Sequence, residues 1–340
     1  MTSLSGTKSV GAGGDYTTIG AAITALGNSE LTGAVVLSLT DATYPSETFP
    51  LTFAPVVGAS ATNTVTIKPA IGVTSTISGA VASGCLLRLN GADYVTIDGS
   101  NGGGSPAGTS RDLTLTNTST TSPATVCIQS LGTGAGATNN TVKNTNISTG
   151  VSAATGYGIS VGSGTGGGVS GADNDNTTIQ NNSITVATVG IYANGTASVS
   201  AGGNDALTIT GNTVDSNTTI QNYGMQLGNA TGASVTGNTV SVESSGAVQP
   251  TAISLETGFV SSSVTGNKVT KALASNSSGY GGRGITIGTG TATSALIIAN
   301  NVVYGVNGSN WSSFGNSSSM GIAIGTIGGS TTLTTTAGGI

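Results

Sequence analysis

The chain has 340 residues, of which 56 are glycine and only 21 are charged, eight basic and 13 acidic, giving a net charge of −5 at pH 7. Because the basic residues are few and scattered, nucleic-acid binding is not expected, since it needs clustered positive charge. The sequence has no apolar run near the roughly 20 residues of a membrane span, so no membrane insertion is expected either.

The first regular feature is an amphipathic stripe within residues 11–31. Four apolar residues follow the i, i+3, i+4, i+7 spacing of one helical face: Ile19, Ala22, Ile23 and Leu26. Thr17 or Thr18 would cap the start of this helix, and Gly27 would end it. We predict a helix over about 17–27 which, with edge strands, forms an N-terminal cap over residues 1–64.

Residues 65–340 carry a repeated hexad, written ITGNTV in its clearest form. Its copies begin 26 to 37 residues apart, at Val142, Ile179, Ile209, Val235, Val264 and Ile298. The two aliphatic positions are five residues apart, so both can face one core only if the chain bends between them. Gly-Asn suits such a bend, because both residues tolerate positive φ. Each hexad therefore predicts a strand, a tight corner and a second strand.

The asparagine that follows each bend falls at the same corner in successive repeats. Stacked asparagine side chains can hydrogen-bond to one another along the stack. We predict a structural ladder of Asn182, Asn212, Asn238, Asn267 and Asn301.

A second phrase alternates with the hexad and keeps step with it. It reads GISV, GIY, GMQL, AISL, GITI and GIAI, beginning at residues 158, 190, 224, 252, 284 and 321. One repeat therefore carries both phrases, which is typical of a solenoid. The sequence predicts an all-β, right-handed parallel β-helix of roughly nine coils with an N-terminal capping helix. No amphipathic segment is visible near residue 340, so that end of the solenoid is expected to be uncapped.

The chain has two cysteines, Cys85 and Cys127. If side chains alternate strictly along GCLLRL, Cys85 faces inward with Leu87 and Leu89, whereas Arg88 faces outward. The aliphatic neighbours of Cys127 place that residue outward. Opposite orientations make a disulfide unexpected, and two free thiols are predicted.

Residues 13–23, which contain GGDYTTI followed by AAI, resemble the cap helix that leads into the coils of pectin-lyase-like β-helix proteins. The phrases VTIKPA, TISG and LNGADYVTIDG, at 65–70, 76–79 and 89–99, resemble repetitive surface or secreted proteins of Bacteroidetes-type bacteria. The resemblance implies an exported protein, so we expect an extracellular or cell-surface location. The start, MTSLSGTKSV, has no signal-peptide pattern.

The resemblance also implies a possible polysaccharide-directed chemistry. Polygalacturonase-like hydrolysis requires histidine, and the chain has none. Lyase-like or methylesterase-like chemistry needs carboxylates close to a basic residue. The weak catalytic candidates are Arg88, Asp93, Asp98, Arg111 and Asp112; the alternative is that they end strands and form surface pairs.

Two other kinds of site are weakly indicated. Asp173 and Asp175 could offer oxygens to Ca²⁺, although the spacing matches no calcium loop and a polar turn is the simpler interpretation. Otherwise no cofactor is expected. Aromatic residues that could stack on sugar rings, or instead pack in the core and loops, are Tyr157, Tyr192, Tyr223, Tyr280 and Trp311.

The leading hypothesis is a non-catalytic, extracellular structural or adhesive β-helix, whose partners are further copies of itself, the rest of a longer chain, or a surface polysaccharide. One alternative is a polysaccharide lyase or esterase. Another is a carbohydrate-binding module without turnover. Retention on polysaccharides, measured together with release of new chain ends, distinguishes the three.

Overall fold

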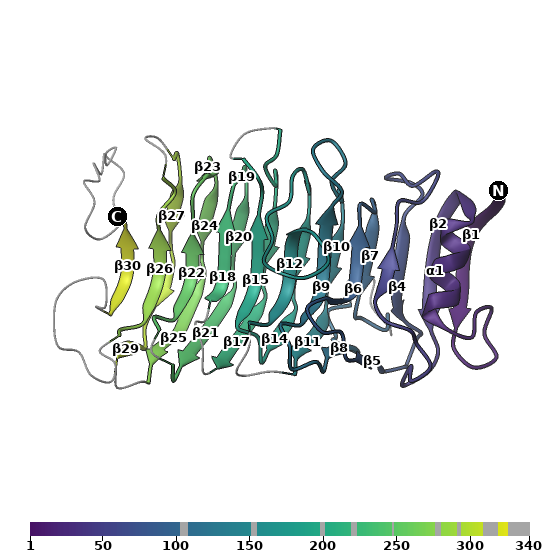
Figure 1. The fold of residues 1–340 in the computed structure, drawn as a ribbon, viewed down its shortest axis with the longest axis horizontal. Coiled ribbons are helices and arrows are strands. Elements are labelled where there is room, and N and C mark those ends of the chain that lie inside the picture. The colour runs from purple at the N-terminus through teal and green to yellow at the C-terminus, as the bar shows by residue number, and fades with distance from the viewer. Residues whose placement is uncertain are drawn as a thin grey trace.

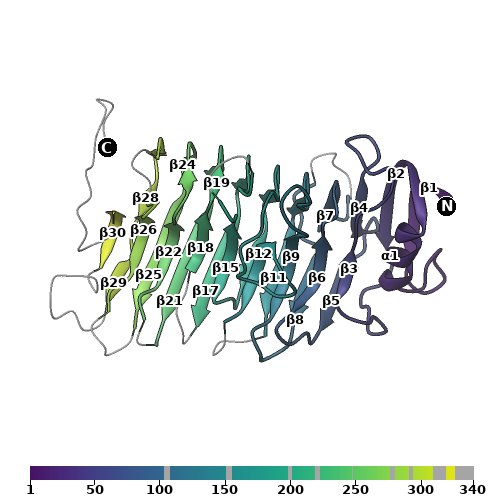
Figure 2. The ribbon, with the colours of Figure 1, turned by 45° about the horizontal axis from the view of Figure 1, so that its top comes forward.

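The computed structural model describes residues 1–102, 108–150, 155–197, 201–218, 223–246, 248–275, 280–290, 294–308 and 319–325. Over these residues the strands form three long parallel sheets of ten, nine and nine strands and one two-stranded sheet. Strands stack side by side along one axis, with the only helix of the described residues at the N-terminal end (Figures 1 and 2). Each regular turn of the chain supplies one strand to each of the three long sheets, which we name A, B and C in the order in which the chain reaches them. This arrangement is a right-handed parallel β-helix, as predicted.

The strand bounds follow the two repeated phrases. Sheet A contains β1 (Thr2–Val10), β2 (Ser29–Leu39), β4 (Val65–Pro69), β7 (Val95–Asp98), β10 (Thr141–Lys143), β13 (Thr178–Gln180), β16 (Thr208–Thr210), β20 (Ser234–Thr236), β24 (Ser263–Thr265) and β27 (Ile297–Ala299). Sheet B contains β5 (Ser75–Gly79), β8 (Leu113–Asn117), β11 (Thr145–Thr149), β14 (Ser183–Thr185), β17 (Thr213–Thr218), β21 (Thr239–Ser244), β25 (Lys268–Ala274), β28 (Val302–Val303) and β29 (Val306–Gly308).

Sheet C contains β3 (Leu51–Phe53), β6 (Cys85–Asn90), β9 (Ala124–Ser130), β12 (Tyr157–Ser163), β15 (Val189–Asn194), β18 (Tyr223–Gly228), β22 (Thr251–Leu255), β26 (Arg283–Ile287) and β30 (Met320–Ile324). The short fourth sheet pairs β19 (Ala230–Thr231) with β23 (Phe259–Val260). Each hexad thus supplies one strand of sheet A and the next strand of sheet B, and the second phrase supplies sheet C.

The corner between sheets A and B has the backbone that the hexad predicts. Gly211, Gly237 and Gly266 adopt φ of 65°, 63° and 65°, and asparagine takes the same conformation where it replaces glycine, as at Asn181 with φ 51°. The bend turns Ile209 and Val214 into one core, where both are fully buried. Burying each such side chain stabilises the fold by about 1.5–3 kcal/mol before entropy is counted.

The small residue that opens the second phrase is explained by close approach to sheet B. A Cβ on Gly190 would lie 2.3 Å from Cγ1 of Val214 and 2.6 Å from the carbonyl oxygen of Gly224. Gly224 is similarly crowded by Val240, at 2.2 Å. Glycine at this position lets sheet C turn tightly onto the core.

The N-terminal helix α1 spans Ile19–Gly27 and is capped by Thr18, whose hydroxyl accepts a hydrogen bond from the N–H of Ala21. Glu47 also accepts hydrogen bonds from the N–H groups of Ile19 and Gly20, at 2.5 and 2.9 Å. A carboxylate is favourable there because the helix dipole is positive at its N-terminus. The structure also adds a strand that the sequence did not predict, because the polar segment Thr2–Val10 pairs with β2 as the first strand of sheet A.

Cys85 and Cys127 form a disulfide, so the prediction of two free thiols is wrong. Their Cα atoms are 5.9 Å apart on neighbouring strands β6 and β9. The error lies in the assumed alternation. The consecutive residues Leu86 and Leu87 both belong to the hydrophobic core, whereas Cys85 joins Cys127 in a separate cluster.

The predicted uncapped C-terminal end concerns residues 326–340, which lie outside the described residues, so end-to-end stacking stays a prediction. No helix within the described ranges is both long and apolar enough to cross a membrane.

Candidate ligand-binding groove

The catalytic candidate Asp98, the last residue of β7, is held by a dense set of partners. Its Oδ1 accepts hydrogen bonds from the backbone and hydroxyl of Ser100, at 3.0 and 2.8 Å, and from the amide of Asn144 at 2.8 Å. Its Oδ2 lies 3.3 Å from Nζ of Lys143. Burial opposes ionisation, but these hydrogen bonds and the lysine lower the pKa of Asp98 below its ordinary value. Asp98 is therefore a charged structural group of the corner between sheets A and B.

The other candidates do not gather around one point. Arg111 donates to the carbonyl and side-chain oxygens of Asn181, both at 2.8 Å, and Asp112 accepts from the N–H of Asn101 at 3.1 Å. Asp93 lies before β7 and accepts two hydrogen bonds from Thr138 at 2.7 Å. Arg88 lies on β6, in sheet C. The structure thus places Arg111 and Asp112 with Asp98 at the corner between sheets A and B. Asp93 lies at the corner between sheets C and A, and Arg88 lies on sheet C.

Asp173 and Asp175 lie in the connection between sheets C and A, with Asp205 one coil further on. Asp173 accepts hydrogen bonds from the N–H groups of Gly134 and Gly202, and Asp175 accepts one from the N–H of Asp205 at 2.7 Å. Burial is the main cause that raises the pKa of Asp175, and the charges of Asp205 and Asp173 add to it. Among the described residues there is no group of three or more acidic, histidine or cysteine side chains placed to hold a metal ion.

The five asparagines of the hexads form a continuous row of hydrogen bonds. From Asn212 to Asn301, each side-chain oxygen accepts hydrogen bonds from the backbone N–H and the side-chain amide of the preceding asparagine, at 2.9–3.1 Å. Each amide also donates to a carbonyl of an earlier hexad, as Asn212 does to Ile179 at 2.9 Å. The row satisfies buried backbone groups at the corner, which stabilises the fold.

Tyr157 and Tyr192 pack edge to face, with ring centroids 5.8 Å apart. Gly167 and Gly168 lie against the ring of Tyr157, and Tyr192 is only 6% exposed. Burial, followed by the neighbouring Tyr192, raises the pKa of Tyr157. The packing leaves Tyr192 buried and Tyr157 half-buried, which disfavours stacking of either ring on a sugar. Trp311 lies outside the described residues.

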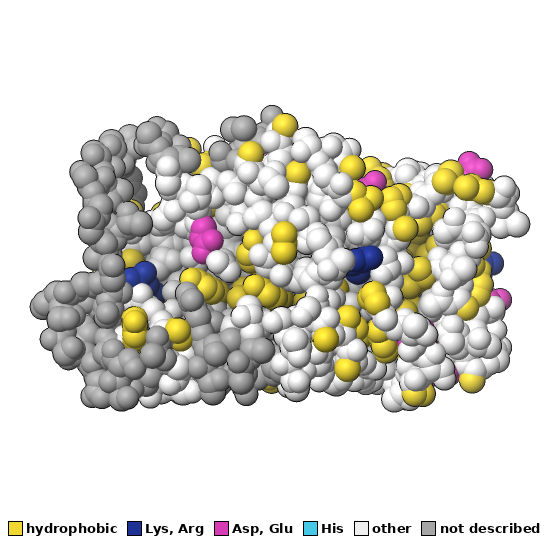
Figure 3. Space-filling model, viewed as in Figure 1, with side chains coloured by type: hydrophobic (Ala, Val, Ile, Leu, Met, Phe, Trp, Pro, Cys, Tyr) yellow, Lys and Arg dark blue, Asp and Glu magenta, His cyan; other side chains and the backbone are white. Residues whose placement is uncertain are grey.

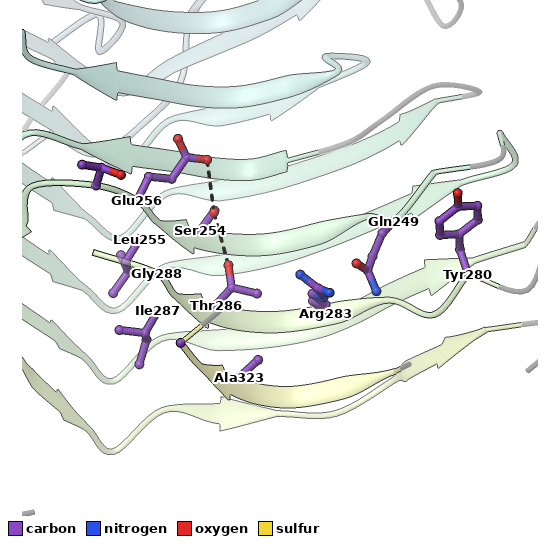
Figure 4. Close-up of a pocket in the computed structure, with 12 residues that line it drawn as sticks. Gln249, Ser254, Leu255, Glu256, Tyr280, Arg283, Thr286, Ile287, Gly288 and Ala323 are labelled. Atoms are coloured by element: carbon purple, nitrogen blue, oxygen red, sulfur yellow. Dashed lines mark hydrogen bonds between the residues drawn. The ribbon is translucent and has the colours of Figure 1, made fainter. Parts of the chain in front are cut away.

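A groove lies on the outer face of sheet C near its C-terminal end, with a volume of about 560 Å³. Seven of the residues that line it carry polar or aromatic groups: Gln249, Ser254, Glu256, Thr257, Tyr280, Arg283 and Thr286. Figure 4 shows Arg283 between Thr286 and Gln249, with Tyr280 beyond Gln249. Charged side chains are otherwise sparse on the side of the molecule viewed in Figure 3.

A row of hydrogen bonds runs along sheet C from β18 into the groove. Gln226, on β18, donates to Oε1 of Glu256 at 2.9 Å. The hydroxyl of Ser254 donates to the same oxygen at 3.3 Å, and the hydroxyl of Thr286 donates to Ser254 at 3.2 Å. Gln226, Ser254 and Thr286 are register partners on β18, β22 and β26, so this row runs along the helix axis. It presents hydroxyl and amide groups at the spacing of the strands.

Arg283 opens β26 and is in register with Thr251 of β22 and Met320 of β30. Burial lowers the pKa of Arg283, which nevertheless stays protonated because guanidinium groups are strongly basic. A partly desolvated guanidinium favours an anionic group such as a carboxylate. The groove can therefore bind an acidic, hydroxyl-rich ligand.

Of the aromatic candidates, only Tyr280 lines the groove, and Tyr223 lies two coils before Arg283 in the same outer column of sheet C. Gln249, Glu256 and Arg283 were not identified from the sequence. They occur once each, in different coils and connections, so no repeated motif points to them. In the structure Arg283 and Thr286 are both partly exposed, with two consecutive buried residues between them. Strict alternation would have put these two positions on opposite faces of the strand.

Two solved structures are similar to this chain. The pectin methylesterase from Aspergillus niger, in deglycosylated form, is 14% identical over 88% of this chain and 86% of its own, with a TM-score of 0.45. The Dettilon tailspike protein is 15% identical over 84% of this chain and 64% of its own, with a TM-score of 0.26. The likeness is one of fold. No family model matches the sequence, and no curated protein is similar to it.

Proposed function

We propose that this chain is an extracellular adhesive β-helix that binds an acidic polysaccharide in the groove on sheet C without turning it over. The observation that carries the proposal is the groove itself, in which Arg283, Tyr280 and Gln249 lie beside the hydrogen-bonded row from Gln226 to Thr286. A guanidinium, an aromatic ring and a line of hydroxyl and amide groups match the carboxylates, ring faces and hydroxyls of an acidic sugar chain.

The presence of one carboxylate among the residues that line the groove supports binding over hydrolysis. Glu256 is the single carboxylate among the residues that line it, and Oε1 of Glu256 already accepts two hydrogen bonds. Glycoside hydrolysis commonly uses two carboxylates that flank the scissile bond. The catalytic candidates Asp98 and Arg111 are engaged at the corner between sheets A and B, away from sheet C.

The disulfide supports the extracellular location. Disulfides form and persist in oxidising compartments and are rare in the reducing cytosol. The bond between Cys85 and Cys127 joins adjacent coils, and both residues are buried, as expected of a structural disulfide.

The test is a panel of acidic and neutral polysaccharides, comprising polygalacturonate, alginate, chondroitin sulfate, dextran and starch. Retention of the protein in affinity electrophoresis and release of new reducing ends are measured together. We expect retention by acidic polymers and no new ends. The variant Arg283→Gln should lose at least tenfold in affinity, whereas Arg88→Gln, on the same sheet but remote from the groove, should retain it.

Two results would contradict the proposal. Equal retention of both arginine variants would show that the groove is not the binding site. New chain ends that disappear in Glu256→Gln would make the protein a chain-cleaving enzyme such as a lyase, which is the alternative that the shared presence of Glu256 and Arg283 in one groove favours.

A further inference from the structure

A glycine-rich loop lies against the outer face of sheet C beside the groove. This loop, residues 163–170, is called the strap; it leaves the end of β12 and returns on itself. Its base is closed by the N–H of Ser163, which donates to the carbonyl of Val169 at 2.9 Å, and by the hydroxyl of Ser163, which donates to the carbonyl of Ser170 at 2.6 Å. The strap is therefore a closed loop with a fixed base.

The strap covers the side chains that point outward from three successive coils. The carbonyl of Gly166 accepts a hydrogen bond from Gln129 of β9 at 2.9 Å, and the carbonyl oxygen of Thr165 lies 3.3 Å from Sγ of Cys85 in β6. The N–H of Gly168 donates to the hydroxyl of Ser160 in β12 at 3.1 Å. These contacts fix the strap over the disulfide.

The glycines of the strap are required by how closely it approaches the sheet. A Cβ on Gly167 would lie 2.5 Å from the ring of Tyr157, and one on Gly168 would lie 2.1 Å from its hydroxyl oxygen. The sequence GTGGG thus lets the backbone lie directly on an aromatic ring.

The strap ends where the hydrogen-bonded row that leads into the groove begins. Ser170 and Tyr192 of β15 lie within 3.4 Å of each other through their hydroxyl oxygens. Tyr192 is the register partner of Gln226, the first member of that row. One strand spacing, about 4.8 Å, separates Tyr192 from Gln226, and the lining of the groove begins one strand further on, at Ser254 of β22.

We propose that the strap blocks one end of the groove, so that the protein binds the end of an acidic polysaccharide chain, or a short oligosaccharide, and not an internal stretch. This inference rests on the proposed function. A polymer that follows the row along the helix axis meets the strap at Tyr192. From Gln226 to Ala323, the row and its continuation cross three strand spacings, or roughly 14 Å, enough for a few sugar rings.

The experiment measures how many protein molecules bind to one sugar chain, with polygalacturonate of several narrow length fractions and short oligogalacturonides as probes. Calorimetric titration gives the stoichiometry. If the groove is blocked, each chain binds one protein molecule at its end whatever its length, and the affinity per chain is the same for polymer and oligomer. A stoichiometry that rises in proportion to chain length would overturn the inference.

A variant in which residues 164–169 are replaced by Asn-Gly should open the groove and raise the number of proteins bound per long chain several-fold. The matched control is Val169→Ser, which changes an exposed side chain of the strap without shortening it and should leave the stoichiometry at one. Circular dichroism and thiol titration verify that the shortened variant keeps its fold and its disulfide.

The wild-type stoichiometry decides the question even if the shortened variant does not fold. Failure of the proposed function gives a different result, because wild-type protein would then bind neither polygalacturonate nor its oligomers.

Discussion

Asn238 accepts two hydrogen bonds from Asn212 on its side-chain oxygen, one from the backbone N–H and one from the amide, both at 2.9 Å. The amide of Asn238 in turn donates to the carbonyl of Ile209 and to Asn267, also at 2.9 Å. Asn238 is only 1% exposed. We expect Asn238→Ala to lower the free energy of unfolding by about 2–4 kcal/mol, because buried donors and acceptors on both sides lose their partners. Denaturant unfolding measures the loss.

The control for this prediction is Thr213→Ala, in the same corner. Thr213 is exposed, so its truncation should change the free energy of unfolding by less than about 0.5 kcal/mol. If the two variants were equally stable, the asparagine row would contribute nothing to the fold.

The disulfide between Cys85 and Cys127 joins residues 42 positions apart. Closing a loop of this length reduces the entropy of the unfolded chain, worth about 4 kcal/mol in the chain-entropy model. The double variant Cys85→Ala, Cys127→Ala should therefore unfold at a clearly lower denaturant concentration. Because both sulfurs are buried, a reductant should act on the wild-type protein only under conditions that unfold it.

The comparison with reductant serves as the control. Wild-type protein unfolded with reductant should approach the stability of the double variant, and the variant itself should not respond to reductant. An unchanged wild-type midpoint in the presence of reductant would show that the cross-link does not stabilise the protein.

The fold could be predicted from the sequence because the residues that determine it recur at a nearly regular spacing. Each hexad contains the corner, both core positions and one asparagine of the row. It recurs often enough that the register between successive coils can be read from the sequence. The helix was predictable for the same reason, since Ile19, Ala22 and Leu26 are buried on one face. The disulfide was not, because strict alternation fails at Leu86 and Leu87, two consecutive residues that are both buried in the core.

The groove was less predictable than the fold, since it depends on residues that break the repeat. Arg283 occupies an outward position that holds Tyr223 and Thr251 in the preceding coils. Gln249 and Tyr280 come from connections, whose path the period does not fix. Tyr157 and Tyr192 suggested stacking on sugars, but Gly167 and Gly168 of the strap lie against Tyr157, and the strap is also placed by Gly166, which approaches Ser83 more than 80 residues earlier in the sequence.

Asp98 makes the stability of the corner between sheets A and B dependent on pH. Although burial works against it, hydrogen bonds from Asn144 and Ser100 and the charge of Lys143 lower the pKa of Asp98 in the folded protein. A lowered folded pKa means that the stabilisation is present above the unfolded value near 4 and is lost as the pH falls through the folded pKa. At pH 7, Asp98→Asn should cost about 2 kcal/mol. Unfolding curves between pH 7 and pH 3 should show this cost shrinking below about pH 4.

Lys143→Met separates the charge from the hydrogen bonds, because it leaves Ser100 and Asn144 in place. It should cost less than Asp98→Asn, since Lys143 is the more exposed partner of the pair. A larger cost for the lysine variant would show that the ion pair, and not the hydrogen bonds, holds the carboxylate.

Asp205 should show the opposite dependence on pH. Burial and, to a smaller extent, the charge of Asp173 raise the pKa of Asp205. Its Oδ1 is buried and has no hydrogen-bond partner among the described residues. A raised folded pKa means that the charged carboxylate disfavours the folded state above that pKa and is relieved as the pH falls through it.

Asp205→Asn should therefore increase the free energy of unfolding at pH 7. The gain should shrink as the pH falls through the raised folded pKa and vanish below the unfolded value near 4, where the wild-type carboxyl is protonated in both states. Asp215→Asn removes the same charge from an exposed position on β17 and should leave stability unchanged. If both variants gained equally, the effect would come from the net negative charge of the protein and not from burial. A loss of stability in Asp205→Asn at pH 7 would mean that its hydrogen bond with the backbone of Thr231 outweighs the penalty of burying the charge.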